Sequence, residues 1–198
     1  MAKVKLTKTE LKNQTDALKR FQRFLPMLQL KKQQLQGEIA GIVAKAEETS
    51  AKEHAVREGL DRWVGLFATD DQTVDGLVKV TAVNTGTANI AGVAIPTFES
   101  IDTEVKDVDV WETPAWVDDA VKTTVQVLSL QCERAIYDEQ RRLVEEELQL
   151  TSQRVNLFEK VKIPECREAI RVIKIALGDE QTAAVTRGKI AKGRAPQS

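Results

Sequence analysis

Few side chains in this 198-residue chain could do chemistry, and those few lie far apart. The only histidine is His54, and the two cysteines are Cys132 and Cys166. We expect both cysteines on one helix, where 34 steps of ~1.5 Å separate them by about 50 Å. That distance excludes a disulfide between them. We interpret them as reduced thiols of a cytoplasmic protein.

The acidic residues offer no better candidate for catalysis or metal binding. The runs Glu145–Glu147 and Asp118–Asp119 fit the outer face of a helix, and His54 is expected to point to solvent. The glycines near Gly86 and Gly92 lack the following lysine that a phosphate-binding loop requires. We therefore expect no catalytic site, cofactor or metal, and a chain that is not an enzyme by itself.

A seven-residue apolar repeat from Leu11 to Phe67 indicates what the N-terminal part forms instead. Two sets of positions, each seven residues apart and offset by three, make a stripe sustained over about eight heptads. Such a repeat predicts a helix of about 85 Å in a left-handed coiled coil. The apolar residues expected in its packed seam include Leu18, Phe21, Leu25, Leu28, Leu35, Ile39 and Ile42.

A second long helix is expected from Ala115 to Leu177, with Gly178 as its stop signal. It has an apolar stripe of its own, with alternating steps of three and four residues. Two such helices in one chain can pack as an antiparallel hairpin, which is favoured over a parallel homodimer because both stripes are already present. The seam residues expected from the second helix include Leu148, Val155 and Phe158, and the stripe resumes at Cys166.

The antiparallel arrangement predicts a register in which residue i faces roughly residue 183 − i. Phe158 then lies opposite Leu25. The polar seam residues Lys32 and Glu53 would fix this register, as buried polar groups can in coiled coils. Glu53 falls near Arg134, its expected partner.

Both helices carry an interior proline, Pro26 in the first and Pro164 in the second. A proline inside a helix removes a backbone donor and clashes with the preceding turn. In the predicted register the two prolines lie about 10 Å apart along the axis. We therefore predict a bend that both helices share.

Residues 68–114 differ in character and are expected to form a small β-hairpin region. The stretches LVKVTAV (77–83) and TEVKDVDVW (103–111) alternate as half-exposed strands do. Between them, NIAGVAIPTFES (89–100) is a further strand or a packed loop ended by Pro96. The chain is thus predicted to be mostly α, with a long helix within 1–67, the hairpin region over 68–114, a second helix over 115–178 and a basic tail over 179–198.

Charge is segregated along the chain although the net charge is only −1. Residues 1–32 carry +7 and residues 174–198 carry +3, whereas residues 68–119 carry −9. An antiparallel fold would collect the basic termini at one end and the acidic segment at the other. This predicts two different docking partners; the alternative, that the charged faces are only solvated, stays open. The candidate basic residues are Lys3, Lys5, Lys8, Arg187, Lys189 and Lys192.

Three segments of the sequence resemble the D subunit of V-type and archaeal-type rotary ATPases. They are KLTKTELKNQTDALKRFQRFLPMLQLKKQQLQ, NIAGVAIPTFE and QRVNLFEKVKIPECREAIRVIKIAL. The resemblance covers the whole chain in order, and the two segments that contain Pro26 and Pro164 are specific. The tail after Leu177 departs from the family because it carries fewer charges before Arg187.

The resemblance implies a rotor shaft in a complex that couples ATP synthesis or hydrolysis to proton or sodium transport. In the family, the coiled coil enters a hexamer of A and B subunits with both termini pointing inward. The small F subunit of the stalk binds beside the shaft, and a funnel-shaped subunit links the shaft to the membrane rotor ring. The chain is therefore expected to be cytoplasmic and peripheral to the membrane, with no span of its own, since no apolar run approaches ~18 residues.

Two other classes of function remain as alternatives. One is a free-standing coiled-coil adaptor or export chaperone, which would bind neither the F subunit nor the hexamer. The other is a nucleic-acid-binding arm that uses the basic termini, with binding that weakens steeply as salt rises. The termini lack aromatic residues that could stack on bases, so we expect no nucleic-acid partner.

Overall fold

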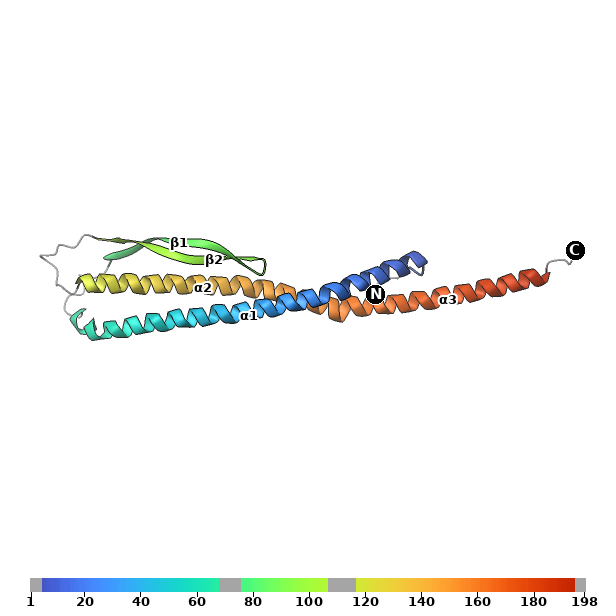
Figure 1. Ribbon diagram of the computed structural model, residues 1–198, viewed down its shortest axis with the longest axis horizontal. Coiled ribbons are helices and arrows are strands. Elements are labelled where there is room, and N and C mark those ends of the chain that lie inside the picture. Colours follow the sequence, from blue (N-terminus) through green and yellow to red (C-terminus); the bar gives the residue numbers. More distant parts are fainter. Residues whose placement is uncertain (1–4, 68–75, 107–116, 195–198) are drawn as a thin grey trace. The chain divides into compact units, whose positions relative to one another are not determined.

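The structure, a computed structural model, describes residues 5–67, 76–106 and 117–194 (Figure 1). The mostly α fold with a small antiparallel β-hairpin that the sequence predicts is confirmed. The elements in chain order are α1 (Lys8–Phe67), β1 (Val78–Ile90), β2 (Val93–Val105), α2 (Val117–Leu157), the π-helical turn η1 (Phe158–Lys162) and α3 (Ile163–Arg194).

Helix α1 is 60 residues long and starts close to the predicted position. Thr7 caps its N-terminus, because the Thr7 hydroxyl accepts a hydrogen bond from the Glu10 backbone N–H at 3.2 Å. Pro26 lies inside this helix without interrupting it. The packing of the long seam therefore stabilises the helix by more than the loss of the Pro26 backbone donor costs.

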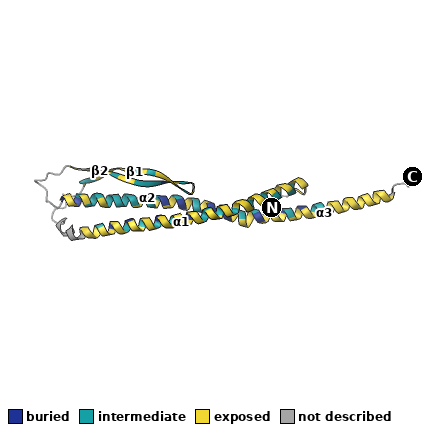
Figure 2. Ribbon diagram, viewed as in Figure 1, coloured by how far each residue is buried: buried dark blue, intermediate teal, exposed yellow. Residues whose placement is uncertain are grey.

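The predicted end of the second helix at Gly178 is wrong, because α3 continues to Arg194. A glycine inside a helix costs only about 1 kcal/mol, and no proline follows before Pro196. The hydroxyls of Thr182 and Thr186 each donate to the carbonyl four residues earlier. Residues 178–193, most of which were predicted to be a tail, thus form a helix that is exposed on all sides (Figure 2).

The hairpin is longer than predicted and has its turn inside NIAGVAIPTFES. Ala91 and Gly92 both have positive φ, 50° and 88°, as a two-residue type I′ turn requires. β2 then runs through Pro96, so the expectation that Pro96 ends this segment is wrong. Proline is tolerated on a strand of a two-stranded sheet, since each strand has one free edge. Residues 107–111 of the second expected strand lie outside the described residues, as does the expected helix start at Ala115.

The chain divides into two compact units. We call Met1–Lys32 with Leu150–Ser198 the terminal unit, and Gln33–Gln149 the central unit. In the central unit the hairpin runs along α2 (Figure 1), and its Ile95 joins a buried cluster with Leu35, Ile42 and Val144. The buried apolar residues of the terminal unit are Val155, Ile163, Cys166, Ala169 and Ile173.

Candidate functional site

The central unit contains a polar contact that sets the register between its two helices. Gln131 donates from Nε2 to Glu53 Oε1 at 3.0 Å, and Arg57 donates to the same oxygen from Nε at 3.0 Å. The expected register placed residue 130 opposite Glu53, so it holds within one residue here. Arg134, the expected partner, acts on Glu53 through its charge.

The hydrogen bond from Gln131 holds the pKa of Glu53 below its usual range, with Arg57 and Arg134 acting in the same direction. Burial opposes this shift, because only 8% of Glu53 is exposed. Glu53 is therefore a buried carboxylate that stays ionised near neutral pH. A buried ionised group that needs a partner on the other helix penalises every other register.

In the terminal unit an aromatic pair joins the first helix to the second. Phe158 packs against Phe21, with ring centroids 4.9 Å apart and planes inclined by 53°. The sequence placed Leu25 opposite Phe158, and the ring contact with Phe21 lies four residues, about one helical turn, from that position. Aromatic pairs gain energy from this tilted geometry beyond the area that they bury.

The ten predicted seam residues differ in how far they are buried. Leu35, Ile42 and Val155 are buried, and the other seven are half-buried: Leu18, Phe21, Leu25, Leu28, Ile39, Leu148 and Phe158. Thr151 is fully buried among them, and its hydroxyl has no hydrogen-bond partner. The terminal unit thus carries one polar atom that weakens its seam.

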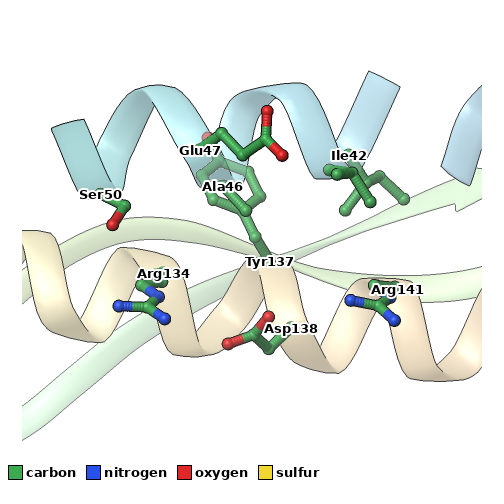
Figure 3. A pocket seen from close by; sticks show the side chains of 9 residues that line it. Ile42, Ala46, Glu47, Ser50, Arg134, Tyr137, Asp138 and Arg141 are labelled. Atoms are coloured by element: carbon green, nitrogen blue, oxygen red, sulfur yellow. The ribbon is translucent and has the colours of Figure 1, made fainter. Parts of the chain in front are cut away.

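A groove of about 210 Å³ lies between α1 and α2 in the central unit (Figure 3). Ile42 and Ala46 of α1 give it an apolar wall, and the Tyr137 ring of α2 extends toward Ala46 and Glu47. The Tyr137 hydroxyl donates to Glu133 Oε1 at 3.0 Å, and burial is the main cause that raises its pKa. Tyr137 therefore stays a neutral donor. Arg134, Asp138 and Arg141 supply charges of both signs at the α2 side.

The π-helical turn lies just before Pro164. The Ile163 backbone N–H donates to the carbonyl of Phe158, five residues earlier rather than four. Pro164 has no N–H, so the Lys160 carbonyl lacks the donor that an α-helix would supply. The sequence predicted a bend at Pro164 that is shared with Pro26. That bend stays a prediction, and the feature that lies beside Pro164 is the π turn. Pro26 has no such turn beside it.

The two units carry large net charges of opposite sign. The terminal unit contains 19 Lys or Arg and 7 Asp or Glu, a net charge of +12. The central unit contains 10 and 23, a net charge of −13. The candidate basic residues Lys5, Lys8, Arg187, Lys189 and Lys192 are exposed members of the terminal unit, and Lys3 lies outside the described residues.

The reactive side chains that the sequence singled out can be placed only in the described part of the chain. Within residues 5–67, 76–106 and 117–194, no group of three or more His, Cys, Asp and Glu could hold a metal ion. Cys166 is buried, and this burial raises the pKa of its thiol, so it is a poor nucleophile at neutral pH. No helix in the same ranges is long and apolar enough to cross a bilayer.

The fold and these sites define a class: a mostly helical protein, built on long helices with one β-hairpin packed against α2. Comparison with known families identifies it further. Residues 10–193 match the family described as the D subunit of ATP synthase, and the chain belongs to that family. The resemblance seen in the sequence is thereby confirmed.

Curated relatives carry a matching description. The D subunit of V-type ATP synthase from Borreliella burgdorferi is 45% identical over 97% of this chain and 95% of its own length. The proteins of the same name from Chlamydia caviae and Chlamydia muridarum are 32% and 30% identical, each over 99% of this chain and over 95% and 98% of their own lengths. The similarity therefore spans both units.

Sequence reasoning missed three contributors to these sites. Gln131 was missed because a rough register does not choose between adjacent residues. Ile95 was missed because a strand pattern does not show which helix a hairpin will contact. The π turn had a visible signal: the apolar stripe steps eight residues from Phe158 to Cys166, where a heptad gives seven.

Proposed function

We propose that the chain is the central-stalk protein, the rotor shaft, of a V/A-type rotary ATPase or ATP synthase. In this role it couples ATP synthesis or hydrolysis by a hexamer of A and B subunits to proton or sodium transport. Family membership supports the assignment, and the contact of Glu53 with Gln131 carries it on structural grounds. Two long helices locked in register resist twisting better than one helix, which is what transmission of torque requires.

The terminal unit is proposed to enter the hexamer. Its net charge of +12 would complement an acidic partner. Single exposed helices are marginally stable in water, so residues 178–193 would gain from a partner that covers them. Apolar side chains for such contacts are exposed in this unit, among them Phe24, Met27, Leu30, Val185 and Ile190.

The central unit is proposed to bind the small F subunit of the stalk and the funnel-shaped subunit that links the shaft to the membrane ring. Its net charge of −13 gives it a different partner preference from the terminal unit. The groove beside Tyr137 offers an apolar wall with charges of both signs, the composition of a polar-rimmed protein interface. The chain would then lie on the cytoplasmic side, peripheral to the membrane.

The two interior prolines are proposed to make the shaft asymmetric. One shaft inside three similar catalytic interfaces must present a different face to each, and a bend achieves this. Replacing Pro26 and Pro164 together by alanine should straighten the helices and weaken coupling. Solution scattering measures the curvature, and unchanged curvature with unchanged coupling would refute the bend.

The decisive experiment reconstitutes the A/B hexamer with and without this chain. We expect the full chain to bind the hexamer and the F subunit, to change the hexamer's rate of ATP hydrolysis, and to hydrolyse no ATP alone. Binding to neither partner would favour the alternative, a free-standing adaptor or export chaperone. A variant with Glu53 and Gln131 both changed to leucine replaces this polar contact by an apolar one and tests whether the fixed register is needed for the effect on the hexamer.

A further inference from the structure

The π turn absorbs one extra residue in a seam that is otherwise heptad. From Val144 the stripe on the second helix runs through Leu148, Thr151, Val155 and Phe158 in steps of four and three residues. The next fully buried residue is Ile163, five residues on, and the half-buried Lys162 lies between them. After Ile163 the regular steps resume through Cys166 and Ile173. With one residue fewer between Phe158 and Ile163, the entire stripe would be a continuous heptad repeat.

The extra residue contributes nothing to the packed seam. None of the residues of η1 is buried, and Lys160 and Val161 are exposed. A continuous α-helix with one residue fewer would bury the same apolar side chains. Folding of the terminal unit alone therefore does not require the π turn.

The backbone hydrogen bonding of the second helix is irregular at this turn. An i→i+5 hydrogen bond replaces the regular bond at Ile163, and Pro164 supplies no donor. Both sides of the turn are anchored: Phe158 packs on Phe21 at one side, and Ile163 and Cys166 are buried at the other. Deformation of the helix should therefore concentrate in the few residues between these anchors.

We propose that η1 and Pro164 form a joint, at which α3 twists and bends relative to residues 150–157 while the seams on both sides stay packed. In a rotary complex this joint is where the shaft yields under torque. That second statement rests on the proposed function; the joint itself does not.

Deletion of Lys160 tests the joint because it removes the extra residue and keeps both seams in register. We expect η1 to become α-helical, the melting temperature to rise, and amide hydrogen exchange at Val161 and Ile163 to slow by at least about tenfold. Lys160→Ala, which keeps the length, should exchange like the wild type. Deletion of the exposed Gln153, in regular α-helix, should shift the heptad and lower the melting temperature.

A Lys160 deletion that lowers the melting temperature, or leaves exchange at Val161 and Ile163 unchanged, overturns the joint. Its use in rotation is tested by reconstituting the complex with each variant. We expect the wild type and Lys160→Ala to give the same ion transport per ATP, and the deletion to lower it at least about twofold. Equal coupling with a stiffened turn overturns the role in rotation. A wild-type chain that does not affect the hexamer refutes the proposed function and leaves the exchange result standing.

Discussion

At the scale of single residues, the side chains that matter most are the polar ones inside the seam. Glu53 is buried but has partners, whereas Thr151 is buried without one. The first specifies register, and the second only weakens packing. Both lie at positions where an apolar residue would be the default for a coiled coil.

Replacing Glu53 with glutamine should make the stability of the chain less dependent on pH. The pKa of Glu53 is lowered on folding, so its contribution is full above the unfolded pKa of about 4.3 and is lost as pH falls through the folded pKa. At pH 7 we expect Glu53→Gln to unfold at lower urea concentration, by roughly 1 to 3 kcal/mol. The difference should shrink toward pH 3.

Glu48→Gln is the matched control for this measurement. Glu48 pairs with Lys52 on the same helix at 2.7 Å, and both side chains are exposed. Exposed pairs of this kind have little effect on stability, so the variant should unfold close to the wild type. Equal urea midpoints for Glu53→Gln and the wild type at pH 7 would remove Glu53 as a determinant of register.

Replacing Thr151 with valine should stabilise the chain by about 1 to 2 kcal/mol. Valine has nearly the same shape, and it removes a buried hydroxyl that has no partner. Thermal unfolding followed by circular dichroism measures the change. Thr124→Val is the control, since the Thr124 hydroxyl donates to the Ala120 carbonyl at 2.7 Å. A gain as large at Thr124 as at Thr151 would contradict the explanation.

At the scale of elements, the stability of the hairpin depends on its turn and on its contact with α2. Asn89 Oδ1 accepts a hydrogen bond from the Gly92 N–H at 2.9 Å, which braces the positive-φ pair Ala91 and Gly92. On the helix side, Gln140 Nε2 donates to the carbonyl of Pro96. The turn keeps the strands in register, and the contact with α2 brings Ile95 into the core of the central unit.

Gly92→Ala should destabilise the hairpin by roughly 1 to 2 kcal/mol. A Cβ at Gly92 would meet no atom within 4 Å, so the penalty comes only from the φ of 88°. Ala91→Asn should have the opposite sign, because asparagine tolerates this conformation better than alanine. Amide exchange of β1 and β2 reports both changes. Faster exchange in both variants, or in neither, would show that the turn does not control the strands.

At the scale of the whole molecule, the boundary between the two compact units also separates regions of opposite net charge. The net charges of +12 and −13 belong to units whose boundaries follow from packing alone. Opposite charges on separate units favour contact between the terminal unit of one copy and the central unit of another when screening is weak.

We expect the isolated chain to self-associate at about 0.02 M salt and to be monomeric above about 0.3 M, where the Debye length falls to several ångströms. Sedimentation velocity across this range measures the change. A variant with Arg187, Lys189 and Lys192 replaced by glutamine should respond less to salt. A sedimentation coefficient that does not change with salt would show that the two charged units do not attract each other between copies.

The sequence by itself determined the mostly α fold, the family and the segregation of charge. The family follows from three segments that resemble it, and the helical fold follows from local periodicity, which Leu35 and Ile42 show at heptad spacing. The register near Glu53 also followed, because a buried charge leaves few alternatives.

Only the tertiary structure decided how the regularities are broken. The extra residue before Ile163 could have been absorbed by a kink, a loop or a shifted seam. The π turn prevails because it keeps Ile163 and Cys166 buried and makes room for Pro164, which cannot donate. Likewise, the tilted ring contact of Phe158 with Phe21 depends on how the two helices pack, which the sequence did not predict. These features depend on competition between contacts of residues far apart in the sequence. Local sequence patterns do not show which of those contacts will form.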